Sequence, residues 1–175
     1  MAAITREEAI AILEDGQRQI DALVARLTEE QLSTPNTIGG GEWSAKDLLS
    51  HVARWNEIAV EALMAWRAGR KPWIEDVWDG GVDRLNAENF EVSRALSPDQ
   101  ARDRVRRSHD ALVGAIRAMD NHEWHSETPY PAERRRWLGM MLGSVTGAPK
   151  QPFGHAFAHL PDLERCVAAS RSPQT

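Results

Sequence analysis

Cysteine, long apolar runs and strand-like alternation are what this sequence lacks. Its 175 residues include a single cysteine, Cys166, which cannot form a disulfide within the chain and fits a reducing compartment. No uncharged apolar run reaches the roughly 18 residues that a membrane span needs. The first residues lack the basic-then-apolar pattern of a signal peptide. We therefore expect a cytoplasmic protein that does not bind a membrane.

An excess of basic charge is absent as well. The formal net charge is −5 and the isoelectric point is near 5.7, whereas nucleic-acid binding requires a basic face that displaces counterions. The arginine-rich runs Arg102–Arg107 and Arg134–Arg136 stand close to carboxylates and are interpreted as solvated helix faces. A small molecule is thus the expected partner, nucleic acid is not, and we expect a monomer or a homodimer.

Helical periodicity dominates the rest of the sequence. Capping signatures at Thr5, Ser44 and Ser97 begin three periodic segments, and each is followed three residues later by an acid or a glutamine. Apolar residues then recur at steps of three, four and seven. The pattern predicts long helices over 5–32, 44–68, 97–119 and 152–169, and shorter helices over 82–95 and 133–145.

No alternating strand pattern competes with these helices. The expected fold class is all-α, a four-helix bundle with one or two short extra helices. We expect one domain over 1–170, an irregular loop over Asp120–Pro131 and a disordered tail over 171–175.

Three histidines are the best candidates for a shared site. His155 and His159 stand four apart in the last predicted helix, a spacing that places both side chains on one face. His51 lies between Leu48 and Trp55 on the apolar face of the second long helix. Facing helices of a bundle commonly hold a metal between such side chains, and three histidines leave positions open for water or substrate. The alternative for each histidine is a packing role in the core.

Two segments that contain these histidines resemble a known superfamily. Glu42–Trp55, with its Trp-Ser pair and His51, looks like the second-helix signature of the DinB-like superfamily, and Gly154–Leu163 looks like its last-helix His-x-x-x-His segment. Asp83–Asn86 and Arg106–Leu112 are similar to the ClbS/DfsB branch of four-helix bundle proteins. The resemblance covers roughly residues 5–168, counted on the printed sequence.

The resemblance implies a four-helix bundle in which His51, His155 and His159 are catalytic residues that hold a divalent metal. Zn, Ni and Fe all accept imidazole, so the ligand type does not choose among them. The implied activities are thiol transfer from a low-molecular-weight thiol, thiol-dependent isomerisation, and inactivation of an electrophilic cyclopropane toxin. We therefore expect a detoxification-type enzyme, a metal-dependent hydrolase or a thiol S-transferase or isomerase. The alternative is a non-catalytic bundle that sequesters a small molecule.

Several other residues bear on this hypothesis. Pro161 stands two positions after His159, where the related iron-dependent sulfoxide synthases have Glu, and it could kink the helix and rotate His159 away. His109 lies on an apolar stripe, so we expect it to be buried and to pack. His122 and His125 are interpreted as solvated loop residues.

Side chains around the site are predicted from their type and position. Tryptophan fills volume and lines pockets, and buried amides can orient a substrate. The residues expected to bind substrate are Trp55, Trp73, Trp78, Asn86 and Asn89. Each metal-binding ring needs a partner on its second nitrogen, for which Glu57, Asp47 and Asp162 are the candidate acids. Cys166 is expected to be a small buried residue.

Overall fold

The structure is a computed structural model that describes residues 4–39, 41–77, 81–128, 130, 137–147 and 151–170. Within these ranges the regular elements are helices, and the isolated β-bridge between Glu127 and Trp137 belongs to no strand. The helices are α1 (Arg6–Val24), α2 (Glu29–Ser33), α3 (Ala45–Arg67), η1 (Trp73–Asp76), α4 (Val82–Arg94), α5 (Pro98–Arg117), α6 (Asn121–Trp124), α7 (Leu138–Val145) and α8 (His155–Ala169). The predicted all-α fold is confirmed.

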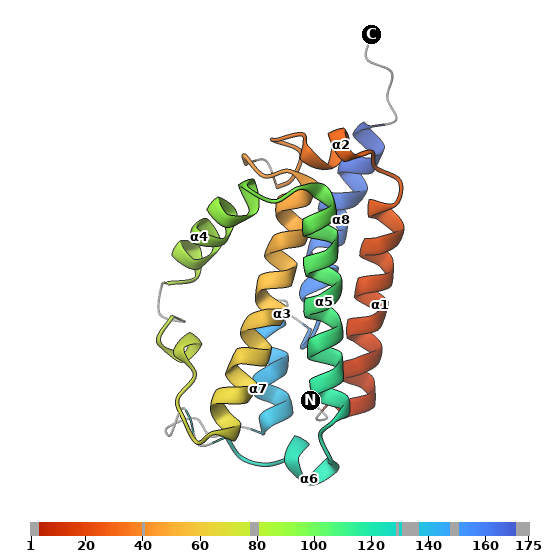
Figure 1. The fold of residues 1–175 in the computed structure, drawn as a ribbon. Coiled ribbons are helices and arrows are strands. Elements are labelled where there is room, and N and C mark those ends of the chain that lie inside the picture. Colours follow the sequence, from red (N-terminus) through yellow and green to blue (C-terminus); the bar gives the residue numbers. More distant parts are fainter. Residues whose placement is uncertain are drawn as a thin grey trace.

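Helices α1, α3, α5 and α8 form the four-helix bundle (Figure 1). Helix α3 packs most extensively against α5, and α1 packs against both α8 and α5. Helix α4 lies against α3 outside the bundle, and the short α7 lies near the lower part of α3. Helices α3 and α8 are therefore neighbours, which brings the two histidine-bearing segments together.

The three predicted capping signatures are present. The side chains of Thr5, Ser44 and Ser97 each accept a hydrogen bond from the backbone N–H three residues later, and the residue there bonds back to the cap. Each such cap stabilises its helix by about 1 kcal/mol relative to alanine. The cap at Ser44 matters for function because it sets where α3 begins and thus the register of His51.

The predicted helix over 5–32 is wrong, because this segment forms two helices. Helix α1 ends at Val24, and Thr28 begins α2 with a fourth capping box that it forms with Gln31. Leu27 and Leu32 are buried and continue the apolar rhythm across the break. Because the apolar spacing continues past Val24, the capping signature Thr28-x-x-Gln31 was overlooked.

Two other segments differ from expectation at their ends. The predicted irregular loop contains a one-turn helix, α6, capped by the side chain of Asp120. The predicted helix over 133–145 begins at Leu138 in the described range, and 133–136 lie outside it, as do Trp78 and the tail over 171–175. The last helix begins at His155 rather than at Pro152.

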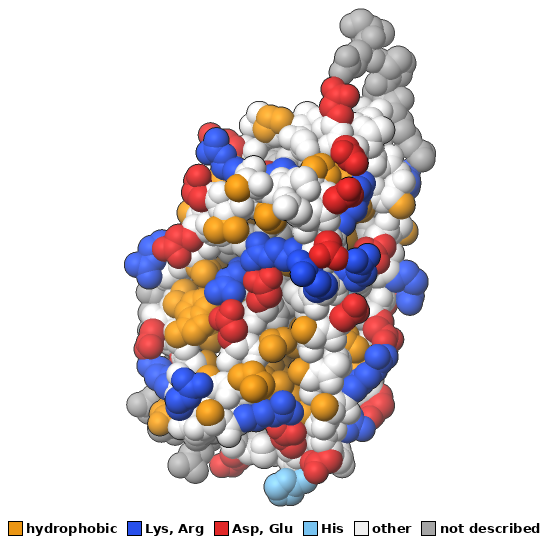
Figure 2. All heavy atoms as spheres, in the orientation of Figure 1, with side chains coloured by type: hydrophobic (Ala, Val, Ile, Leu, Met, Phe, Trp, Pro, Cys, Tyr) orange, Lys and Arg blue, Asp and Glu red, His pale blue; other side chains and the backbone are white. Residues whose placement is uncertain are grey.

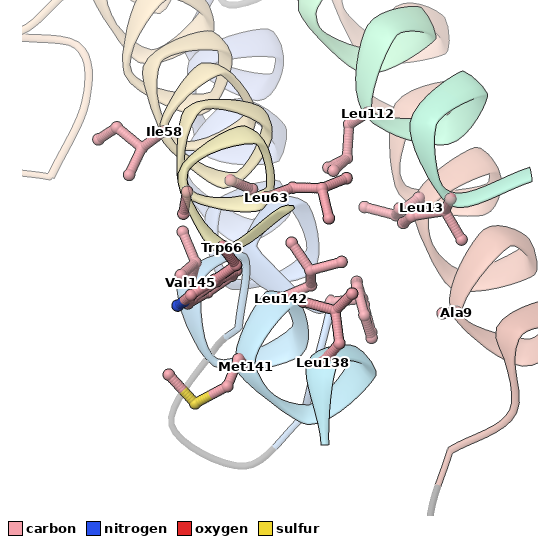
Figure 3. Close-up of a cluster of buried hydrophobic side chains, with 14 of the residues drawn as sticks. Ala9, Leu13, Ile58, Leu63, Trp66, Leu112, Leu138, Met141, Leu142 and Val145 are labelled. Atoms are coloured by element: carbon pink, nitrogen blue, oxygen red, sulfur yellow. The ribbon is translucent and has the colours of Figure 1, made fainter. Parts of the chain in front are cut away.

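The apolar core consists of two clusters stacked along the bundle. One contains Leu13, Leu63, Leu112 and Leu142 among others (Figure 3). The other gathers residues nearer the opposite end of the bundle, including Ile20, Leu48, Val105, Leu163 and Val167. Each of the four bundle helices thus contributes to this second cluster. The three histidines lie near the junction of the two clusters.

The surface view shows acidic and basic side chains intermixed over one face of the molecule, with apolar side chains between them (Figure 2). None of the helices in the described ranges combines the length and the apolar character that a membrane crossing requires.

Candidate metal centre

His51 on α3 and His155 and His159 on α8 meet inside the bundle. The Nε2 atom of His155 lies 3.1 Å from Nε2 of His51 and 3.1 Å from Nε2 of His159. Ligand atoms of the three rings all lie within 4.8 Å of one another. The expected convergence is therefore observed, while the role of these rings as metal ligands stays a prediction.

Two of the three spacings between ring nitrogens fit a tetrahedral ion, and the third pair of ligand atoms lies within 4.8 Å. Bonds of 2.0–2.1 Å with tetrahedral angles separate two ligand atoms by roughly 3.3 Å, close to the two measured distances of 3.1 Å. Imidazole nitrogen is a ligand that Zn, Ni and Fe share. Among the described residues, no other cluster of three or more histidine, cysteine or acidic side chains has a comparable arrangement.

Pro161 does not disturb this arrangement. Helix α8 continues through Pro161 to Ala169, so the loss of one backbone hydrogen bond to Phe157 is tolerated. His159 precedes Pro161 by two positions and keeps its place one turn after His155, with the two ring centroids 4.8 Å apart. The expected kink at Pro161 therefore does not rotate His159 away from His155.

The three rings are electrically neutral near pH 7. Burial, and then the neighbouring His159, lower the pKa of His51 from 6.5 to about 3. Burial also lowers the pKa of His155 well below its ordinary value, with the rings of His51 and His159 adding to the effect. The pKa of His159 is lowered by burial and partly restored by Asp162. Neutral rings keep a lone pair for a metal ion and leave the charge of that ion uncompensated.

Aromatic rings form the wall around the centre. The ring centroid of Trp43 lies 5.1 Å from that of His51, and the centroid of Trp55 lies 5.8 Å from that of His155. Trp43 in turn stacks on Phe90 of α4 at 5.8 Å. Of the residues expected to bind substrate, Trp55 is the one in contact with the histidines.

The structure also places the three candidate acids. Asp162 Oδ2 lies 3.9 Å from Nδ1 of His159, one turn further along α8. Asp47 is bound to the α3 cap, to Lys46 and to Ser93. Glu57 forms a two-pronged ion pair with Arg104. Asp162 is thus the acid that faces a ring of the centre.

A cavity of about 220 Å³ adjoins the centre at His159. It is lined by Ile38, Gly39, Gly41, Trp43, Leu48, His159 and Asp162, and we call it the mouth pocket. Sequence reasoning treated 39–41 only as loop, because glycines carry no side-chain chemistry to signal a binding site. The signal in the sequence that could have indicated the pocket is the glycine run between two helices, close to Trp43.

The remaining candidate residues lie elsewhere. Trp73 is 40% exposed, donates a hydrogen bond to Glu61 and carries the guanidinium of Arg54 over its ring. Asn86 is half-buried on α4, and Asn89 accepts a hydrogen bond from Arg104. None of Trp73, Asn86 and Asn89 lines the mouth pocket, so their role in substrate binding is not supported by its geometry.

The other histidines separate into two environments. His109 on α5 is buried, as expected, and burial lowers its pKa. His122 and His125 are exposed, and Nδ1 of His125 contacts the carbonyl of Asn121. Cys166 is buried on α8.

This fold and this three-histidine arrangement define the class: the chain is a DinB-like helical bundle protein. A family model described as the mycothiol maleylpyruvate isomerase N-terminal domain matches residues 13–146, more than half of the chain. The chain belongs to that family. The matched range includes His51 and ends before His155 and His159. The more specific likeness to the ClbS/DfsB branch stays a prediction.

Solved structures support the same fold. An uncharacterised protein from Escherichia coli UTI89 is 14% identical, with a TM-score of 0.77 over 97% of this chain and 96% of that one. A mycothiol-dependent maleylpyruvate isomerase is 20% identical, with a TM-score of 0.64. A variant of it in which a histidine is replaced by alanine is 19% identical, with a TM-score of 0.65.

The chain is similar to only part of the isomerase. The match covers 91% of this chain and 61% of the isomerase chain. At these identities the likeness shows the fold alone. No curated protein sequence matches the chain.

Proposed function

We propose that this protein is an enzyme that transforms an electrophilic small molecule in a thiol-dependent reaction at His51, His155 and His159. The observation that carries the proposal is the convergence of three neutral imidazoles, one of which, His159, lines an open pocket. Membership of the mycothiol maleylpyruvate isomerase N-terminal family supports the thiol. The isomerase neighbours, described as mycothiol-dependent, point to the same chemistry.

A divalent ion held by the three Nε2 atoms would lower the pKa of a bound thiol or water and polarise an electrophile. The protein's own residues supply the setting for this chemistry. Because neutral rings do not cancel the positive charge of a bound ion, that charge would attract a thiolate. The largely apolar walls of Ile38, Trp43 and Leu48 limit the access of bulk water. His159 belongs to the three-histidine group and also lines the pocket, so an occupant of the pocket would contact the centre at His159.

The proposed step forms a carbon–sulfur bond. The thiol gives up its proton to solvent or a base, and the thiolate attacks the electrophilic carbon of the substrate. The electron pair of the broken bond, from a strained ring or a conjugated double bond, moves onto the substrate, which then takes up a proton. In an isomerisation the adduct rotates about the former double bond and gives its proton back to solvent or a base. The electron pair left on carbon re-forms the double bond as the carbon–sulfur bond breaks, and the departing thiolate takes up a proton to regenerate the thiol. In a transfer the thioether is the product.

The test begins with the metal content of the purified protein and continues with turnover. Activated epoxides, activated cyclopropanes and maleylpyruvate would be offered to the zinc-loaded protein with and without mycothiol. Turnover that requires both zinc and thiol supports the proposal. Equal turnover without thiol would show hydrolysis instead. Stoichiometric substrate binding without turnover would favour the sequestering bundle.

A further inference from the structure

A layer of polar side chains crosses the centre of the bundle. Gln17 on α1, Asn56 on α3, His109 on α5 and His155 on α8 each project toward one shared cavity. One residue comes from each of the four bundle helices, and we call this set the polar layer. In sequence each member falls near the point where its helix passes from one apolar cluster to the other.

The cavity within the polar layer has room for one water molecule. Its volume is about 10 Å³, and a single water requires roughly 10–15 Å³ measured in this way. The cavity is otherwise lined by Leu13, Val52, Thr146, Phe153 and Ala156. A water held there would need two to four polar partners, and the layer provides that number.

The polar groups around this cavity lack partners among themselves. Nδ1 of His155 is buried and has no hydrogen-bond partner in the described part of the chain. The side chain of Asn56, only 5% exposed, packs within the bundle beside the same cavity. The amide nitrogen of Gln17 donates a hydrogen bond to Asp21 at 2.9 Å, so the amide oxygen of Gln17 is not used in that bond. Buried polar groups in folded proteins are nearly always hydrogen-bonded.

We infer that Asn56 and Gln17 position His155 through one buried water, which accepts the Nδ1–H of His155 and donates to the two amide oxygens. A ring that offers Nε2 to a metal carries its proton on Nδ1, so Nδ1 acts as a donor and needs an acceptor. A water oxygen accepts that hydrogen bond and has two hydrogens left for two acceptors. The inference rests on the proposed function in so far as it concerns the metal.

The relay and Asp162 supply second-nitrogen contacts to two of the three rings from two sides of the molecule, while Nδ1 of His51 is buried without a partner among the described residues. Asp162 faces Nδ1 of His159 from the mouth pocket, whereas the polar layer serves His155 from the interior. Fixing Nδ1 of His155 holds its Nε2 toward His51 and His159. Asn56 is therefore a positioning residue, and His109 completes the polar wall without being the required acceptor.

Two substitutions at Asn56 separate positioning from packing. Asn56→Leu keeps the branching and the number of side-chain heavy atoms and removes the acceptor, so zinc affinity should fall about 10–100-fold, the usual effect of losing an outer partner of a ligand. The stability of the metal-free protein should hold or rise, because an apolar core side chain replaces a buried amide. Asn56→Asp keeps the acceptor, so zinc affinity should be retained while stability falls, because a carboxylate is buried. Ser108→Ala is the control, since Ser108 is equally buried but bonds to the Val105 carbonyl.

Zinc affinity would be measured by competition with a chromophoric chelator, and stability by urea unfolding with the metal removed. A packing role predicts the opposite order, in which Asn56→Leu binds zinc normally and Asn56→Asp binds it poorly. That order would overturn the inference. A protein that binds zinc with the expected order but turns over no substrate would contradict the proposed function and leave the inference standing.

A second readout requires no metal. Long-range ¹⁵N–¹H NMR spectra distinguish the Nδ1–H form of an imidazole from the Nε2–H form. In the metal-free protein we expect His155, assigned by comparison with His155→Gln, to be mainly in the Nδ1–H form. Asn56→Leu should move it toward the Nε2–H form, and Ser108→Ala should not. Identical His155 signals in the wild-type protein and Asn56→Leu would overturn the inference even if the wild-type protein bound no zinc.

Discussion

Nε2 of His51 lies 3.1 Å from Nε2 of His155, although 104 positions separate them in the sequence. Two neutral rings at this distance either share a proton or direct both lone pairs at a common ion. Because His159 brings a third Nε2 atom within 3.1 Å of His155, the second arrangement satisfies all three rings at once. This relationship is the basis of the predictions that concern metal.

His155→Ala should remove high-affinity zinc binding. His155 is the central member of the group, since its Nε2 is close to both other rings. Its removal leaves two ligands, too few for a three-histidine site. Zinc stoichiometry after dialysis, measured by elemental analysis, would fall from one per chain to near zero. The exposed His122 offers the matched control, and loss of zinc in His122→Ala as well would point to a different binding site.

The metal-free protein should lose stability as the pH falls below about 6.5. The pKa of His51 is about 3 in the folded protein and 6.5 ordinarily, so between these values the unfolded chain binds a proton that the folded chain does not. One such histidine lowers the free energy of unfolding by about 1.4 kcal/mol per pH unit. Urea unfolding between pH 8 and 5 in the presence of a chelator would measure the slope.

His51→Asn supplies the control for the pH experiment. Its unfolding free energy should depend less steeply on pH than that of the wild-type protein, because one neutral buried histidine is gone. Equal slopes in both proteins would mean that His51 is not held neutral by burial.

Asp162→Asn should weaken zinc binding without preventing folding. The carboxylate of Asp162 lies 3.9 Å from Nδ1 of His159, and an acid behind a ligand histidine raises its basicity and fixes its orientation. A 10-fold or greater loss of affinity is the expected size. Asp15→Asn removes a similar carboxylate from a surface pair with Arg18 and should have no effect. Similar affinities for the two variants would exclude Asp162 from the centre.

Most of the fold could be predicted from the sequence because its signals are local. Capping boxes and apolar periods act within one or two turns, so the positions of α3, α5 and α8 followed from them. The break between α1 and α2 was missed for the same reason: Leu27 and Leu32 continue the apolar pattern, and the capping signature at Thr28 competes with it.

The candidate site could be predicted only in part. The spacing of His155 and His159, the apolar position of His51 and the family resemblance together predicted that the three rings converge. The mouth pocket and the polar layer depend on which helices become neighbours. Caps and apolar periods act within one helix and do not specify its neighbours. Trp73 and Asn89 were chosen by residue type; the structure shows Trp73 bonded to Glu61 and Asn89 bonded to Arg104, and their role in substrate binding stays a prediction.

Gly41→Leu should obstruct the mouth pocket. Gly41 lines that pocket, and a Cβ atom placed on it meets no other atom within 4 Å, so the backbone there accepts a side chain. If substrate enters here, KM should rise several-fold while zinc affinity and stability stay within error. Gly114→Leu places the same side chain on an exposed position of α5 and should leave KM unchanged. An unaltered KM in Gly41→Leu would direct attention to another route.

Gly16→Ala should destabilise the bundle although alanine favours helices. Glycine in a helix interior costs about 1 kcal/mol relative to alanine, but a Cβ atom on Gly16 would lie 2.8 Å from Cβ of Ala156 on α8. Overpacking of this kind costs about 1–3 kcal/mol, and a methyl group has no rotamer by which to move away. We therefore expect a lower free energy of unfolding in urea, and weaker zinc binding because Ala156 adjoins His155.

Gly114→Ala is the counterpart of this change, since a Cβ atom on Gly114 of α5 meets nothing within 4 Å. It should raise the free energy of unfolding by up to about 1 kcal/mol through helix propensity alone. Opposite signs for the two variants would show that close contact between α1 and α8 requires glycine at position 16. If both variants were stabilised, α8 would have room to shift, and the tight fit of α1 against the helix that carries His155 would be refuted.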